Sequence, residues 1–378
     1  MESDLGIGFT NAPGMIVAFL IAISFLVFFH ELGHYLVARW CGIRILAFSL
    51  GFGPEIVGRT DKHGTRWKFC AIPLGGYVRF YGDEDAASRP DFAGVEALPP
   101  EERARTFNGA ALWKRTLTVA AGPIANFLLA IAIFAVIFSV YGRGVSDPVV
   151  GEVVPDSPAA AAGVAPGDIM VALDGQKVGT FDAVVRYVSV RPGVPIELTV
   201  ERDGAPLDLT VVPERIEEQD QFGNAMELGR IGVVGTRDSS NFRVERYQPL
   251  EAIGQGALQS WHIVVSTYDY ITNVFAGRMK ADQIGGPVRV ATMAGQMASL
   301  GIVAFANFAA ILSVSVGLFN LLPVPMLDGG HLLFYAIEAV RGRPLSVRIQ
   351  EFAFRIGLFL VLALMVFATW NDTIGRMG

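Results

Sequence analysis

The amino-acid sequence predicts a polytopic α-helical membrane protein with about four transmembrane helices. The chain has 378 residues, of which 52% are hydrophobic and only 17% are charged, and its mean hydropathy is +0.44. In soluble proteins about a quarter of the residues are charged, so this chain is too apolar for that class. The formal net charge of -6 gives no indication of a nucleic-acid partner.

Four apolar runs are long enough to cross a bilayer as helices. The core of the first, Met15 to Phe29, contains no charged residue. The N-terminal residues before it are acidic and lack the positive region of a signal peptide, so we expect this segment to stay in the mature protein. The predicted spans are Pro13–Arg39, Thr116–Tyr141, Ala298–Leu322 and Phe352–Trp370.

A metal-binding motif, His30-Glu31-Leu32-Gly33-His34, directly continues the first apolar run. A helix places residues i and i+4 on one face, so His30 and His34 can hold one metal ion together. Glu31 can then take a proton from a metal-bound water without being a ligand. The same pattern arises by chance on solvated helices, but ionisable groups at membrane depth are costly and indicate function.

A third ligand is expected from the region after the third span. A catalytic zinc takes three protein ligands and keeps an open position for water. Asp328 is the candidate carboxylate, although a turn residue before two glycines is the ordinary interpretation, and His331 is the rival ligand. Pro323 and Pro325 end the span. Asn320 either donates to a developing oxyanion or caps the helix end.

Residues 45–81 show short alternating runs with glycine and proline between them, which predicts β-hairpins. Beside a membrane active site such backbone can re-enter the bilayer against protein, and its edge can hold an unwound substrate by strand addition. Gly51 and Gly53 are the substrate-facing candidates in this stretch. A plain cytoplasmic hairpin explains the pattern equally well. Residues 83–105 are predicted to form a poorly ordered polar loop.

A small soluble domain is predicted after the second span, at residues 147–215. Val149–Val153 and Ile196–Val200 alternate like strands, and Ser157-Pro158 is a helix start signal. Residues 216–297 are expected to contain an extended stretch and an amphipathic helix at Pro249–Arg278 that lies on the membrane.

Lysine and arginine predict the orientation of the chain. They concentrate between the first and second spans and between the third and fourth spans. The positive-inside rule places both regions in the cytoplasm, so both termini and the soluble domain lie outside. The metal motif and Asp328 then meet on the cytoplasmic side of the membrane.

Several motifs resemble the site-2 metalloprotease family, and within it the bacterial regulator-of-sigma-E proteases. Val153–Gly175 also resembles the core of a bacterial PDZ domain, a fold that binds extended peptide ends. The resemblance covers nearly the whole chain, except that only one PDZ unit is found where the best-known members have two. The matching motifs are His30-Glu31-x-x-His34, Pro73-Leu-Gly-Gly-Tyr-Val-Arg79, Ala121-Gly-Pro-Ile-Ala-Asn126, Gly286-Pro-Val288 and Asn320-Leu-Leu-Pro-x-Pro-x-Leu-Asp328-Gly.

The resemblance implies a zinc intramembrane protease of the bacterial inner membrane. Such enzymes cut single-span proteins, such as anti-sigma factors in stress-response signalling, after a first cut has removed the outer domain. It implies a periplasmic PDZ domain that binds peptide or acts as a size filter, and a re-entrant β-loop. The implied ligands are His30, His34 and Asp328, with Glu31 as the base, and the implied substrate-facing residues are Asn320, Pro323 and Pro325.

Two other functions are consistent with parts of the sequence. One is a membrane-anchored zinc protease that acts on soluble or misfolded chains at the membrane face. The other is a PDZ adaptor with a dead catalytic core, which predicts a broken motif, whereas all four site residues are present.

The expected order is a first span (1–40), a re-entrant β region with a loop (41–112), a second span (113–142), a PDZ domain (147–215), an extended stretch with an amphipathic helix (216–297), a third span (298–328), a short helix with a loop (329–350) and a fourth span (351–371).

Overall fold

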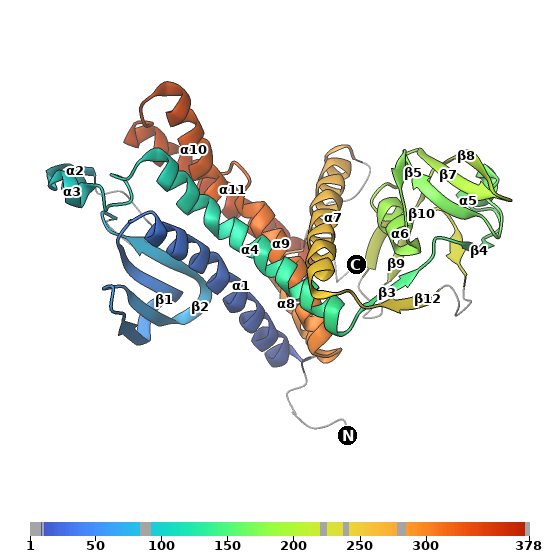
Figure 1. Cartoon of the computed structure of the whole chain (residues 1–378), viewed down its shortest axis with the longest axis horizontal. Helices are drawn as coiled ribbons and strands as arrows, with labels where there is room; N and C mark the ends of the chain where they lie inside the picture. The colour runs from blue at the N-terminus through green and yellow to red at the C-terminus, as the bar shows by residue number, and fades with distance from the viewer. Residues whose placement is uncertain are drawn as a thin grey trace, which may run out of the picture. The chain divides into compact units, whose positions relative to one another are not determined.

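The chain forms two compact units in a computed structural model that describes residues 9, 11–83, 92–219, 225–236, 242–277 and 285–374. One unit comprises residues 1–133 together with 285–378, and the other comprises residues 134–284. The first unit consists of long helices with a β-hairpin, and the second contains the remaining strands (Figure 1).

Four of the described helices are long and apolar enough to cross a membrane. This confirms the expected multi-pass membrane protein. α4 belongs to the first unit up to Ile133, and its last turns belong to the second unit. The four helices are α1 (Ala12–Trp40), α4 (Leu112–Val140), α9 (Ile302–Asn320) and α11 (Val347–Ile374).

The third span begins later than the hydropathy indicates. Residues 287–299 form a separate helix, α8 (Pro287–Ser299), and Gly301 adopts a φ of +108° before α9 begins. Glycine tolerates this backbone conformation without steric cost, so the chain turns there. α10 (Asp328–Arg341) follows α9 after a short loop.

The prediction of a disordered polar loop was wrong for residues 92–103. This segment forms two short helices, α2 (Phe92–Ala97) and α3 (Pro100–Arg103). Pro100 occupies the first turn of α3, where a missing backbone N–H carries no penalty. Residues 84–91 of that predicted loop lie outside the described residues.

Small residues bring α4 into close contact with two other helices. A Cβ atom at Gly33 of α1 would lie 2.3 Å from the carbonyl oxygen of Ala121 on α4. A Cβ atom at Gly317 of α9 would lie 3.1 Å from the carbonyl oxygen of Pro123. Without a hydrophobic driving force in lipid, such close backbone approach is the main source of helix–helix attraction.

The predicted hairpin is present as β1 (Ile45–Thr60) and β2 (Arg66–Phe80). The strands are bent, so that Ala47–Leu50 aligns with Gly76–Arg79 and also with Arg66–Phe69. The register shifts repeatedly around Gly51, whose φ is +86°, and a Cβ atom there would lie 2.7 Å from the carbonyl oxygen of Ile72. Glycine is therefore required at this bulge.

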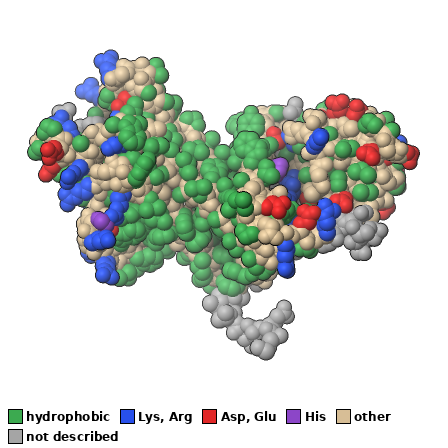
Figure 2. All heavy atoms as spheres, in the orientation of Figure 1, with side chains coloured by type: hydrophobic (Ala, Val, Ile, Leu, Met, Phe, Trp, Pro, Cys, Tyr) green, Lys and Arg blue, Asp and Glu red, His purple; other side chains and the backbone are tan. Residues whose placement is uncertain are grey.

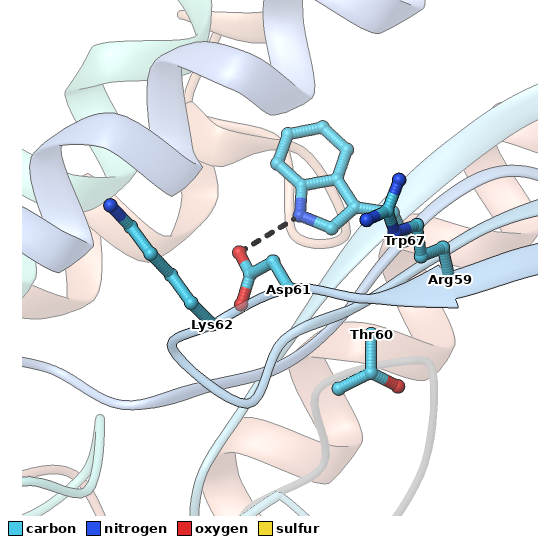
Figure 3. A pocket seen from close by; sticks show the side chains of 5 residues that line it. All are labelled: Arg59, Thr60, Asp61, Lys62 and Trp67. Atoms are coloured by element: carbon cyan, nitrogen blue, oxygen red, sulfur yellow. Dashed lines mark hydrogen bonds between the residues drawn. The ribbon is translucent and has the colours of Figure 1, made fainter.

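The turn of the hairpin is organised by Asp61. Its carboxylate accepts hydrogen bonds from Trp67 Nε1 at 3.1 Å, drawn in Figure 3, and from Tyr35 Oη of α1 at 3.2 Å. The backbone N–H groups of His63 and Thr65 donate to the other carboxylate oxygen, at 2.8 and 3.0 Å. Asp61 thus links the hairpin to α1 through Tyr35, the residue that follows His34. It also lines a shallow pocket with Arg59, Thr60, Lys62 and Trp67.

The second unit is an α+β fold. A four-stranded antiparallel sheet has the order β6-β5-β7-β8, and three further pairs are β4–β11, β3–β12 and β9–β10. Its elements are β3 (Arg143–Ser146), β4 (Val150–Val153), α5 (Pro158–Ala162), β5 (Ile169–Leu173), β6 (Gln176–Lys177), α6 (Phe181–Ser189), β7 (Ile196–Arg202), β8 (Ala205–Val211), β9 (Glu214–Gln219), β10 (Ala225–Arg230), β11 (Val233–Gly235), β12 (Phe242–Glu245) and α7 (Pro249–Phe275).

Local sequence explains two features of this unit. Ser157 caps α5, because its side chain accepts a hydrogen bond from the backbone N–H of Ala160. The amphipathic helix predicted from Pro249 is α7, and its C-terminal half is bound to the end of α6. Arg191 pairs with Asp269 at 2.5 Å, and Asn273 Nδ2 donates to the carbonyl oxygen of Val190 at 2.7 Å.

The turn at Asp61 makes stability depend on pH. Burial alone would raise the pKa of Asp61, but the hydrogen bonds from Trp67, from the His63 and Thr65 amides and from Tyr35 outweigh it and lower the pKa to about 2. Because the pKa of Asp61 in the folded protein is below its ordinary value of 3.8, the ionised carboxylate stabilises the fold above pH 3.8. This stabilisation is lost as the pH falls through about 2.

We therefore expect the parent protein to melt at a higher temperature than Asp61→Asn at pH 6 in detergent. The difference should shrink as the pH is lowered from about 4 towards 2. A difference that stays constant over this range would show that the Asp61 charge does not stabilise the turn.

Candidate metal centre

Three side chains from α1 and α10 converge on one point. His30 Nε2 lies 3.2 Å from His34 Nε2 and 3.1 Å from Asp328 Oδ2, and His34 Nε2 lies 3.6 Å from Asp328 Oδ1. Zinc bonds of about 2.0–2.1 Å in tetrahedral geometry separate neighbouring ligand atoms by about 3.3–3.4 Å. The three residues therefore have the spacing of ligands around one zinc ion, and within the described residues they form a group that could hold a metal.

The far nitrogen of each imidazole points at α4. His34 Nδ1 lies 2.8 Å from the carbonyl oxygen of Thr118. A carbonyl oxygen can only accept, so Nδ1 carries the proton and Nε2 keeps its lone pair for a metal. His30 Nδ1 lies 3.2 Å from the side-chain amide of Asn126. Both rings are thus held with Nε2 facing the convergence point.

Gly122 of α4 lies directly against both imidazoles. A Cβ atom at this position would lie 2.3 Å from His34 Nε2 and 2.9 Å from His30 Cε1. Asp328 Oδ2 is buried and makes no hydrogen bond to any described residue, although it lies 3.1 Å from His30 Nε2. Asp328 Oδ2 therefore faces the lone pair of His30 Nε2. Two such acceptors repel each other unless a cation lies between them, which is how two ligands of one metal ion are arranged.

Asp328 is the first residue of α10, and the loop before it is tightly folded. Met326 has a φ of +85°, which is uncommon for a residue other than glycine and is a source of strain. Cβ atoms at Gly329 and Gly330 would lie 2.2 Å from the carbonyl oxygen of Leu322 and 2.4 Å from that of Val324. Both glycines are helical, and their small size lets the loop pack on α10.

An ion pair holds α10 against α4. Arg115 donates two hydrogen bonds to the Glu338 carboxylate, at 3.2 and 2.6 Å, and its guanidinium lies 5.1 Å from the centre of the Tyr335 ring. The exposed fractions of the two charged side chains are 13% and 14%. A bidentate pair with so little solvent contact fixes the orientation of the helix that carries Asp328.

The hairpin passes directly beside Glu31. A Cβ atom at Gly76 of β2 would lie 2.9 Å from Val27 Cγ1 and 3.1 Å from Glu31 Cγ. The backbone N–H of Val78, two residues further along β2, also faces the Glu31 carboxylate. Sequence reasoning chose Gly51 and Gly53, which lie at the bulge opposite Ile72, and did not single out Gly76. The Pro73–Arg79 motif was the signal that could have identified it.

The other predicted site residues are not part of the metal group. His331 is outside the metal group and packs against aromatic rings, with the Phe354 ring centre 5.3 Å away. Asn320 is the last residue of α9, and Pro323 is exposed in the following loop. Pro325 lies against α11, because a Cβ atom at Gly357 would be 2.0 Å from its carbonyl oxygen.

The apolar helices and the His-His-Asp group, with Glu31 next to the first ligand, are typical of a membrane metalloprotease. Residues 18–364 match the family model described as Peptidase family M50, and the chain belongs to this family. Its relatives are named as zinc metalloproteases, and the His-His-Asp group fits that metal. The chain is therefore a multi-pass zinc metalloendopeptidase of the site-2 protease type.

Similar proteins cover almost the whole chain. The protein R01501 of Rhizobium meliloti (strain 1021), named as a zinc metalloprotease, is 65% identical over 362 residues, which are 96% of this chain and 97% of that protein. The zinc metalloprotease Atu1380 of Agrobacterium fabrum is 61% identical over 365 residues, 97% of each chain. Metalloprotease MmpA of Caulobacter vibrioides is 40% identical over 381 residues, 95% of each chain.

The space at Gly122 can be tested with a single methyl group. We expect Gly122→Ala to weaken zinc binding at least tenfold, because the added Cβ atom contacts both imidazoles at the metal position. Zinc content after equilibration with a competing chelator measures the effect, and circular dichroism checks that the helices form.

Gly254→Ala on α7 is the matched control, because a Cβ atom at that helical glycine meets no atom within 4 Å. Equal zinc content in Gly122→Ala and Gly254→Ala would contradict the position assigned to the ion.

Proposed function

We propose that this protein is an intramembrane endopeptidase that cleaves single-span membrane proteins within or near the bilayer. The observation that carries the proposal is the position of the metal group. His30 and His34 lie on α1, a candidate membrane span whose preceding turns carry no charge. Ionisable residues are costly at membrane depth, so their presence there favours chemistry performed on a membrane substrate.

The geometry supports the following catalytic roles. His30, His34 and Asp328 would hold the zinc ion, which when bound supplies Lewis-acid activation of a water and a peptide carbonyl. Glu31 adjoins the first ligand and faces β2, so its carboxylate can accept the proton of the attacking water. It then delivers this proton to the leaving amine. Asn320 is proposed to donate to the substrate backbone or the developing oxyanion.

The hairpin is proposed as a re-entrant element that presents the substrate. A transmembrane helix must unwind before its backbone reaches a protease site, and an unwound segment can pair with a strand edge. β2 passes beside Glu31 at Gly76 and Val78, which supports such a role. The bulge that contains Gly51 and Gly53, together with Pro323 and Pro325 ahead of Asp328, would line the substrate path.

The basic surface supports a cytoplasmic orientation of the metal centre. Figure 2 shows that lysine and arginine gather where the β1–β2 hairpin and α10 lie, whereas hydrophobic side chains cover the long helices of this unit. Hairpin residues of this set include Arg59, Lys62, Arg66 and Lys68. We therefore place this end in the cytoplasm of a bacterial inner membrane, with both termini and the second unit in the periplasm.

The second unit is proposed to act as a PDZ domain that controls substrate entry. Its four-stranded sheet and α6 fit that fold. It would bind a peptide end or exclude substrates whose outer domain has not been removed. Single-span anti-sigma-factor-like proteins are the substrate class that this arrangement suits, and stress-response signalling is the corresponding process.

Substitution of Glu31 tests the catalytic assignment. Glu31→Gln should retain zinc, because Glu31 is not a ligand, and should slow cleavage of a single-span substrate by about 10²–10⁴-fold, the usual contribution of a general base. His34→Ala is the contrasting variant and should lose both zinc and activity. Cleavage by Glu31→Gln at the parent rate would exclude Glu31 as the base.

The position of the cut tests the intramembrane proposal. Mass spectrometry of the products should place the scissile bond within or beside the apolar segment of the substrate. Cuts confined to soluble loops would instead support a protease that acts on soluble or misfolded chains at the membrane face.

A further inference from the structure

Asn126 is a fully buried polar residue on α4, and one of its side-chain atoms lacks a partner. Its exposed fraction is 0%, and its Nδ2 lies 3.2 Å from His30 Nδ1. Its Oδ1 is buried and makes no hydrogen bond to any described residue. A buried amide oxygen without a hydrogen bond is costly, so this arrangement requires an explanation.

The chemistry of His30 determines which amide atom should face it. Nε2 of His30 points at the metal position, so it must keep its lone pair, and the ring proton of a neutral imidazole must then be on Nδ1. An amide N–H facing an imidazole N–H would place two donors together. Rotating the amide by 180° places Oδ1 toward Nδ1–H, which satisfies the ring proton and the orphaned oxygen at once.

We propose that Asn126 is a positioning residue that accepts a hydrogen bond from His30 Nδ1–H and so fixes the tautomer that binds zinc through Nε2. This inference rests on the proposed role of His30 as a zinc ligand. α4 then orients both imidazoles, since the carbonyl oxygen of Thr118 holds His34 in the same way at 2.8 Å. Outer partners of this kind fix the orientation of a metal-binding histidine and raise its basicity.

Packing against α9 keeps Asn126 in place. Ser313 Oγ donates to the backbone carbonyl oxygen of Asn126 at 2.8 Å. A Cβ atom at Gly317 would lie 3.3 Å from Asn126 Cβ, so α9 leaves little room for the side chain to move away. The contact between Asn126 and His30 is therefore imposed by three helices, α1, α4 and α9.

Two substitutions distinguish acceptance from donation. An ionised aspartate can accept a hydrogen bond but cannot donate one, whereas leucine has a similar shape and can do neither. In the full chain in detergent, Asn126→Leu should raise the zinc dissociation constant by about 10–100-fold, as measured by chelator competition. Asn126→Asp should bind zinc within about threefold of the parent or more tightly, because it retains the acceptor.

Controls separate this inference from the proposed ligand set and from effects on folding. Thr116→Val removes a hydroxyl that, among the described residues, bonds within α4 to the Leu112 carbonyl oxygen, and should leave zinc affinity unchanged. His30→Ala should abolish tight zinc binding, and its failure to do so would reject the ligand set itself. Melting temperatures of the metal-free proteins report folding, and the comparison of Asn126→Asp with the parent is decisive even if Asn126→Leu does not fold.

Two results would overturn the role of Asn126 even if His30→Ala loses zinc as expected and the ligand set stands. If Asn126→Asp weakens zinc binding tenfold or more, the amide acts as a donor toward Nδ1. If Asn126→Leu binds zinc as the parent does, Asn126 only fills space between the helices. The visible absorption of the cobalt-substituted proteins gives an independent comparison, because its intensity depends on the ligand geometry.

Discussion

The structure depends on placing polar metal-binding groups inside an apolar helical unit. Imidazole and carboxylate groups lose their hydration there, and only hydrogen bonds or a cation can compensate. The protein meets this requirement with contacts from neighbouring helices. α4 supplies the Thr118 carbonyl oxygen, the Asn126 side chain and the space at Gly122, while Arg115 holds the helix that begins at Asp328. The same need explains the close contacts of Gly33 and Gly317 with α4, because these supporting atoms must lie within hydrogen-bonding reach.

The sequence was sufficient for features that arise within short segments. Hydropathy identified the four candidate spans, and the i, i+4 spacing placed His30 and His34 on one face. The hairpin and the capping residue Ser157 also follow from local chemistry. The pairing of these histidines with Asp328 was inferred from charge distribution and from family resemblance, because nothing local brings residues so far apart in sequence into contact.

Features that depend on contacts between elements were missed. Gly76 and Gly122 are needed for what packs against them, and sequence alone does not show which glycines face Glu31 or the imidazoles. The contact of Asn126 with His30 is set by the crossing of α1 and α4, which no local pattern in the sequence predicts. The start of the third span was misplaced because hydropathy does not detect the turn at Gly301.

The central claim is that His30, His34 and Asp328 bind one zinc ion beside Glu31. Anomalous diffraction at the zinc absorption edge, from crystals of the full chain, tests it most directly. The account predicts a single strong peak between α1 and α10, with two histidine nitrogens at about 2.0–2.1 Å and an Asp328 oxygen at about 2.0–2.2 Å. A peak bound by His331 in place of Asp328, or one away from the two histidines, would contradict it.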